Sequence, residues 1–123
     1  MKMPRCSAVS CGLVLCLLAV SGCAKPAEPK VDENKPLDEV KAEAEKMNAK
    51  QLRTMTMKYK EAATEKTGEA DKIFLKLKDT PDITSLKGEI DSVNKSISAL
   101  TERYFIYFNE LKKKGGDLSG LEF

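Results

Sequence analysis

Residues 83–111 read ITSLKGEIDSVNKSISALTERYFIYFNEL, and apolar side chains recur along this stretch at steps of three and four residues. The repeat runs through four heptads and is carried by Ile83, Leu86, Ile90, Val93, Ile97, Leu100, Tyr104, Tyr107 and Leu111. This spacing places all of these residues on one stripe of an α-helix, as in coiled coils. The stretch therefore predicts a long amphipathic helix that packs on a second helix along this stripe, which we call the seam.

Both ends of this predicted helix carry boundary signals. Thr80 can act as the N-cap, and Pro81 suits the first helical position. At the other end, the lysines at 112–114 precede the glycines at 115–116. Cations at a helix C-terminus followed by glycine indicate that the helix stops there.

The chain upstream of the turn is also predicted to be helical. Between Leu37 and Asp79 there is no proline, and most apolar residues follow one another at intervals of three or four. This pattern weakens around Gly68, which costs roughly 1 kcal/mol relative to alanine inside a helix. The sequence leaves two alternatives open: one continuous helix, or two helices with a break near Gly68.

The short connection between the two helical stretches favours antiparallel packing. In this arrangement Ile97 should face Ala63, and Tyr107 should face Leu52. The predicted fold class is all-α: an antiparallel helical hairpin resembling a coiled coil, or a small three-helix bundle. The helical domain is expected to span residues 37–115, with a C-terminal tail at 116–123.

One turn of the second helix is apolar on nearly all sides. Residues 104–108 read YFIYF, and Phe105, Ile106 and Phe108 lie off the seam. A hairpin cannot cover these three side chains, and a large exposed apolar patch usually marks an interaction site. They are therefore the candidate interaction residues, for self-association or for contact with another protein.

Three segments could cover this turn. Residues 69–78 could break off as a third helix, the tail at 117–123 could fold back, or a second chain could bind. A further alternative is a small pocket for a lipid or another apolar ligand, lined by the aromatic residues together with Met55 and Met57.

The N-terminus has the layout of a signal peptide. Lys2 and Arg5 precede an apolar run at 12–20, GLVLCLLAV. Such a run is too short to span a bilayer, which needs about 20 residues, but it suits a segment removed on export.

The residues that follow, Val20-Ser21-Gly22-Cys23, resemble the lipobox of bacterial lipoproteins. The resemblance implies that residues 1–22 are removed and that Cys23 receives a diacylglycerol and becomes the first residue. It also implies a lipid-anchored protein of the cell envelope. Position 24 is alanine rather than an aspartate that retains lipoproteins in the inner membrane, so in a Gram-negative cell we expect the periplasmic face of the outer membrane.

Lipidation at Cys23 would change the cysteine and charge balance. The other cysteines, Cys6, Cys11 and Cys16, would leave with the signal peptide, so no disulfide or thiol would remain. Removing Lys2 and Arg5 would leave 19 basic against 19 acidic side chains. Residues 23–36 would form a proline-rich, extended and flexible tether.

The remaining sequence predicts no catalysis. The chain contains no histidine, and it has no phosphate-binding or calcium-binding loop pattern. We therefore expect no enzyme activity, no metal, no cofactor and no nucleic-acid partner. The predicted function is a membrane-anchored structural or protein-interaction module, with binding of a small apolar ligand as the alternative.

Overall fold

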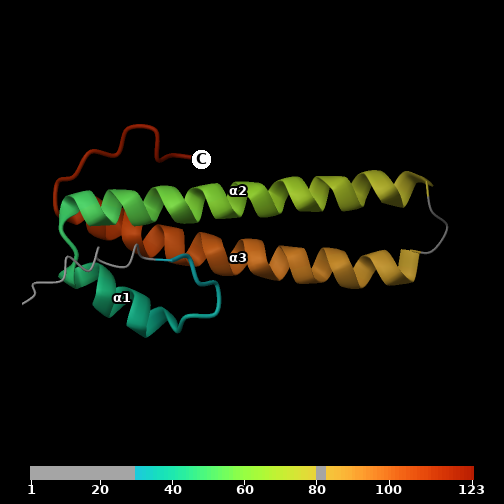
Figure 1. The fold of residues 1–123 in the computed structure, drawn as a ribbon, viewed down its shortest axis with the longest axis horizontal. Helices are drawn as coiled ribbons and strands as arrows, with labels where there is room; N and C mark the ends of the chain where they lie inside the picture. The colour runs from blue at the N-terminus through green and yellow to red at the C-terminus, as the bar shows by residue number, and fades with distance from the viewer. Residues whose placement is uncertain (1–29, 80–82) are drawn as a thin grey trace, which may run out of the picture.

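The computed structural model describes residues 30–79 and 83–123, and its elements are three α-helices (Figure 1). Helix α1 spans Leu37–Lys46, helix α2 spans Ala49–Asp79 and helix α3 spans Ile83–Lys113. The described residues contain no strand, so the all-α prediction is confirmed. The predicted signal peptide, lipidation site and Thr80-Pro81 turn lie outside the described residues.

Helices α2 and α3 form an antiparallel hairpin, and α1 packs on α3 (Figure 1). Each long helix has 31 residues, which corresponds to about 46 Å at 1.5 Å per residue. Helix α1 covers only the end of the hairpin where α2 begins and α3 ends, and we call this end the base. At the opposite end, the tip, the described residues are those of the two long helices alone.

The break in the upstream helix falls at Met47 and Asn48, not at Gly68. A reciprocal capping box begins α2 there. The Gln51 N–H donates to the Asn48 side chain at 2.9 Å, and the Asn48 N–H donates to the Gln51 side chain at 3.0 Å. Gly68 lies within the continuous helix α2. The third helix is therefore formed by residues 37–46 and not by the predicted segment 69–78.

The predicted stop of α3 is a Schellman motif. The Gly116 N–H donates to the Leu111 carbonyl at 3.0 Å, and the Gly115 N–H donates to the Lys112 carbonyl at 3.1 Å. Gly115 has a φ of 67°, a value that glycine adopts without steric cost. The chain thereby reverses direction, and the tail runs back along α2.

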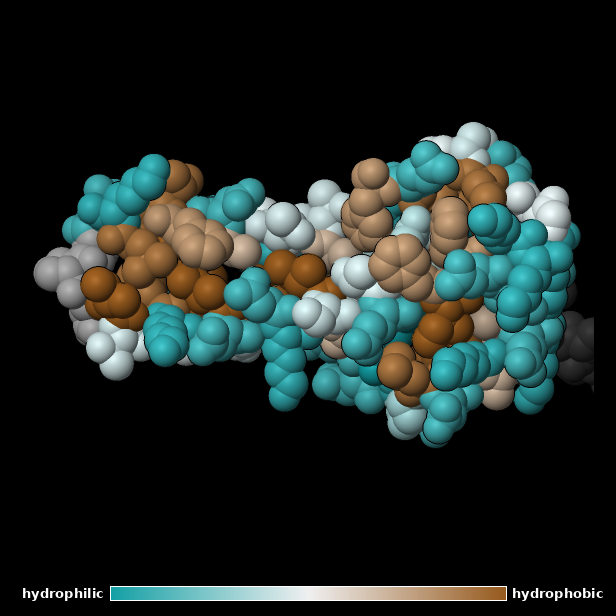
Figure 2. Space-filling model, turned by 180° about the vertical axis from the view of Figure 1, so that it is seen from behind, coloured by the Kyte–Doolittle hydropathy of each residue, from teal (hydrophilic) through white to brown (hydrophobic). Residues whose placement is uncertain are grey.

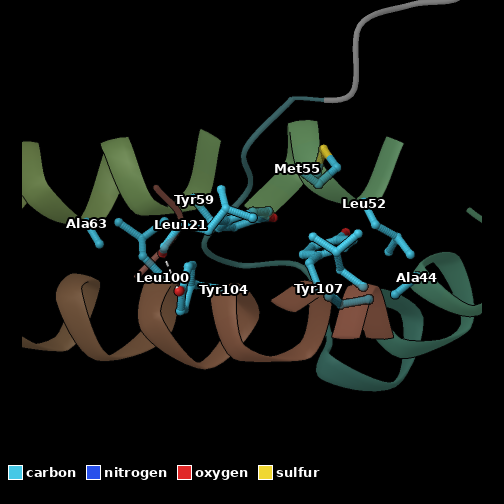
Figure 3. Packing of buried hydrophobic residues seen from close by; sticks show 11 residues of the cluster. Ala44, Leu52, Met55, Tyr59, Ala63, Leu100, Tyr104, Tyr107 and Leu121 are labelled. Carbon is cyan, nitrogen blue, oxygen red and sulfur yellow. Dashed lines mark hydrogen bonds between the residues drawn. The ribbon is translucent and has the colours of Figure 1, made fainter. Parts of the chain in front are cut away.

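The core lies at the base and combines side chains from all three helices and the tail (Figure 3). Its members are Val40, Ala44, Leu52, Met55, Tyr59, Ala63, Leu100, Tyr104, Tyr107, Leu111 and Leu121. The Tyr107 ring stacks on Tyr59 with centroids 5.4 Å apart. Leu52, the predicted partner of Tyr107, belongs to the same buried cluster (Figure 3).

Burial along the seam of α3 decreases from the base to the tip. Tyr104, Tyr107 and Leu111 are buried, Ile90 and Ile97 are half-buried, and Ile83 is 65% exposed. The seam prediction thus holds at the base. It fails at Ile83, whose side chain is mostly exposed.

Part of the predicted tether belongs to the folded domain. Val31 packs against the core. The Asp32 N–H donates to the Tyr59 hydroxyl, and this hydroxyl donates to the Asp32 carbonyl, each over 3.2 Å. The domain therefore begins before Leu37. The remainder of the tether, residues 23–29, lies outside the described residues.

Candidate interaction surface

The YFIYF turn is covered on two sides and open on a third. Tyr104 and Tyr107 are buried, whereas Phe105 is 49% exposed. Ile106 is half-buried and lines a shallow hollow between α1 and α3. Phe108 is half-buried and stacks on Tyr104 with ring centroids 5.5 Å apart. Of the three candidate interaction residues, only Phe105 is largely exposed.

The tail provides one of the predicted coverings. Leu121 is fully buried, and its carbonyl accepts a hydrogen bond of 2.5 Å from the Tyr104 hydroxyl. The Phe123 ring meets the Tyr104 ring edge-on at 4.7 Å. Tyr104 is therefore enclosed by the tail of its own chain, and this part of the turn cannot meet another molecule unless the tail moves.

Two cations on α2 hold the backbone of the tail. The Arg53 guanidinium donates to the carbonyls of Asp117 and Ser119, and the Lys60 ammonium donates to those of Gly120 and Glu122. Positive charges thus satisfy carbonyls that a short irregular segment would otherwise leave to water.

The tail is also ordered within itself. The N–H and the hydroxyl of Ser119 both donate to the Asp117 carboxylate. These hydrogen bonds, together with the nearby charge of Arg53, lower the pKa of Asp117 below its ordinary value.

Arg103 of α3 and Lys114, the residue directly after α3, bind backbone carbonyls of segments upstream of α2. The Lys114 ammonium donates to the carbonyls of Glu45 and Met47, each at 2.7 Å, and so caps the C-terminus of α1. The buried Arg103 guanidinium donates to the Lys35 carbonyl. Sequence analysis missed Arg103, because a single arginine beside the seam is usually solvent-exposed.

The core contains two buried polar atoms for which the described residues provide no hydrogen-bond partner: Arg103 Nε and the Tyr107 hydroxyl. Burial raises the pKa of Tyr107 and of Tyr59 above the ordinary value of 10.0, because the phenolate form would lose its hydration. Burial raises the pKa of Tyr104 in the same way. Burial thus raises the pKa of all three tyrosines of the chain.

A second exposed apolar region lies at the tip. Phe74 is 50% exposed, Leu75 is 60% exposed and Ile83 is 65% exposed. Figure 2 shows apolar side chains gathered at both ends of the hairpin on the face seen from behind. Sequence analysis did not single out Phe74 or Leu75, although the stretch KIFLKLK at 72–78 places three large apolar residues in a row. Three consecutive residues of a helix cannot all lie on the side that faces the partner helix, and only Ile73 is buried.

None of the three helices of the described part is long and apolar enough to cross a membrane. Among residues 30–79 and 83–123, no group of acidic side chains comes together in a way that could hold a metal ion. What the described residues offer is contact surface: the exposed Phe105 at the base and the apolar tip.

Comparison with protein-family models, with curated protein sequences and with solved structures finds no match for this chain. The functional argument therefore depends on the sequence and on the geometry described above.

Proposed function

We propose that this protein is a lipoprotein of the bacterial cell envelope, anchored through Cys23, with a helical domain that acts as a structural or protein-interaction module. The observation that carries the anchor is the sequence around Cys23. A basic start, a short apolar run and the residues Val20-Ser21-Gly22 precede this cysteine in the order that the lipobox requires.

The interaction role is supported by large apolar side chains on the surface of a small domain. Phe74, Leu75, Ile83 and Phe105 are each about half-exposed or more. Phe105 lies at the base and the other three lie at the tip, and exposed apolar patches are typical of sites that bind other macromolecules. A lipid anchor would keep such a surface at the membrane, where partners are concentrated.

Metabolic labelling with a fatty acid tests the anchor. The parent protein should carry the label, and Cys23→Ser should lose it, because the serine hydroxyl is not the acceptor of the lipid. The matched control is Cys16→Ser, which lies in the predicted leader behind Leu15 and should retain the label. A Cys23→Ser protein that is still labelled would overturn the assignment of the anchor.

Fractionation on a density gradient tests the membrane. With Ala24 after the cysteine, the protein should sediment with outer-membrane markers in a Gram-negative host. Recovery with inner-membrane markers would contradict the proposed location. An Ala24→Asp variant should move toward the inner membrane if the sorting rule of enteric bacteria applies.

Binding of a small apolar ligand is the second candidate function. It is favoured by a surface hollow of about 470 Å³ between α2 and the tail, lined in part by Met57, Lys60 and Gly120. Met57 is partly exposed there. Native mass spectrometry of the purified protein should then find a retained lipid, and a protein that retains none and captures none from added fatty acid would remove this candidate.

A further inference from the structure

One row of side chains on α2 leads from the tail to the tip. Arg53, Lys60, Thr67 and Phe74 are spaced by seven residues, so they follow one another along the same side of the helix. The first two hold the carbonyls of the tail. The tail therefore lies over the start of this row, and Phe74 stands at its uncovered end, 50% exposed.

A matching row on α3 leads in the same direction. Tyr104, Ile97, Ile90 and Ile83 are also spaced by seven residues. Tyr104 binds the tail through its hydroxyl. Exposure then increases along the row, from buried Tyr104 through half-buried Ile97 and Ile90 to Ile83 at 65%.

Because both rows begin under the tail, they lie on the same face of the hairpin. The tail leaves Thr67 and Phe74 of α2 and Ile83, Ile90 and Ile97 of α3 uncovered on this face, and we call this part the bare face. A heptad row drifts by about 20° per repeat on a straight helix, so the isoleucines turn gradually out of the seam. Ile73 and Leu86 are buried in this region, so its exposed apolar surface comes from Phe74 and from the isoleucine row.

We propose that the bare face binds the bare face of a second copy of this chain, so that two hairpins form a short four-helix bundle at their tips. Isoleucines repeated every seven residues fit the holes between side chains of a facing helix. The tail occupies the same face at the base, so only an antiparallel overlap of the tips keeps both tails outside the contact.

The charges favour a second copy over a membrane surface. Interfacial helices carry lysine and arginine along the polar flank. The middle of the bare face carries Thr67 and is instead flanked by Asn94 and Thr101. Toward the tip both signs of charge are present: Asp71 and Lys78 lie near Phe74, and Lys87 lies between Ile83 and Ile90 along α3. Opposite charges can pair across a two-fold contact, whereas Asp71 would repel anionic lipid headgroups.

The area indicates a weak dimer. A half-exposed phenylalanine contributes about 100 Å², and with the three isoleucines the bare face offers on the order of 300 Å² of apolar surface per copy. A standard interface buries about 800 Å² per partner. The contact should therefore be transient in dilute solution and be strengthened where the protein is concentrated.

Site-specific photo-crosslinking of the full chain in cells tests this contact. A benzophenone amino acid at Phe74 should give a product of twice the chain mass. The matched control places the same probe at Leu75, which is at least as exposed but lies about 100° around the helix, off the bare face. With the probe at Phe74, Ile83→Asp should reduce the crosslinked fraction about tenfold, while helix content stays unchanged because Ile83 is already exposed.

Several results would overturn the proposal. They are the absence of a dimer product from the Phe74 probe, equal products from the Phe74 and Leu75 probes, and products of the Phe74 probe that contain only lipid or another protein. The inference rests on the proposed role as an interaction module but not on the anchor. Fatty-acid labelling of Cys23 and crosslinking at Phe74 can therefore fail separately. A parent protein that carries no fatty-acid label but still crosslinks through Phe74 would place the error in the anchor alone.

Discussion

Replacing Tyr107 or Tyr104 with phenylalanine should have opposite effects on stability, although each change removes one buried hydroxyl and keeps the ring. The Tyr104 hydroxyl donates to the Leu121 carbonyl over 2.5 Å. The Tyr107 hydroxyl is buried and has no hydrogen-bond partner among the described residues. The two substitutions therefore separate the value of a made hydrogen bond from the cost of an unmade one.

The expected magnitudes follow from these environments. An intramolecular hydrogen bond contributes about 0.5–1.5 kcal/mol net, so Tyr104→Phe should lower the free energy of unfolding by about 1 kcal/mol. An unpaired buried hydroxyl costs about 1–3 kcal/mol in protein mutational data. Tyr107→Phe should therefore leave the free energy of unfolding unchanged or raise it by up to about 1 kcal/mol. For a domain of this size, 1 kcal/mol shifts the Tm by roughly 4–8 °C.

Urea unfolding followed by far-ultraviolet circular dichroism measures both variants against the parent. Equal slopes with denaturant would show that the two variants unfold to similar extents. A Tyr107→Phe variant that loses as much stability as Tyr104→Phe would refute the reasoning, because the Tyr107 hydroxyl would then have a partner. An unchanged Tyr104→Phe variant would contradict the docking of the tail.

Gly68→Ala should raise the free energy of unfolding by about 0.5–1 kcal/mol, because Gly68 lies inside α2 and nothing lies within 4 Å of an added Cβ. Gly116→Ala should have the opposite effect, because its Cβ would lie 2.1 Å from Leu111 Cδ1. Thermal unfolding should show that this variant loses about 1–3 kcal/mol of unfolding free energy. Equal effects of Gly68→Ala and Gly116→Ala on this free energy would contradict the geometry. At alkaline pH all three tyrosines should stay protonated in the folded protein, because burial raises their pKa above 10.0. Unfolding then releases protons, so stability is full below pH 10.0 and falls as the pH rises above it. A spectrophotometric titration should show tyrosinate appearing together with loss of helix, and a tyrosine that ionises near its ordinary pKa without loss of helix would disprove this.

The seam could be predicted because the periodicity of apolar residues specifies which side of a helix is buried. The prediction failed at Ile83, since burial at a helix end depends on what the partner helix places opposite, and periodicity does not contain that information. The break at Met47 was missed although a signal was present: Asn48 and Gln51 have the spacing of a capping box. The penalty of Gly68 was given too much weight, because buried Ala63 and Ala70 keep the helix packed on both sides of it.

The candidate site was predicted only in part. The sequence predicts that the YFIYF turn is apolar, and it offers the tail as one of the segments that could cover this turn. The path of the tail could not be predicted. Its hydrogen bonds join cations of α2 to backbone carbonyls, and because every residue has a carbonyl, the sequence does not indicate which ones are bound. Phe74 was missed because its exposure depends on where α1 packs: this helix covers the base and leaves Phe74 exposed, which is a property of the assembled fold.

The hydrogen bonds from cations to backbone carbonyls affect which changes of sequence this protein can tolerate in evolution. Every residue offers a carbonyl, so Arg53, Lys60 and Lys114 would still find acceptors after most substitutions in the segments that they hold. The path length is constrained much more tightly, because Leu121 must reach its buried position from the turn at Gly115. Homologous chains should therefore vary freely in the residues between these two points but seldom in their number, so that insertions and deletions there would be rarer than replacements.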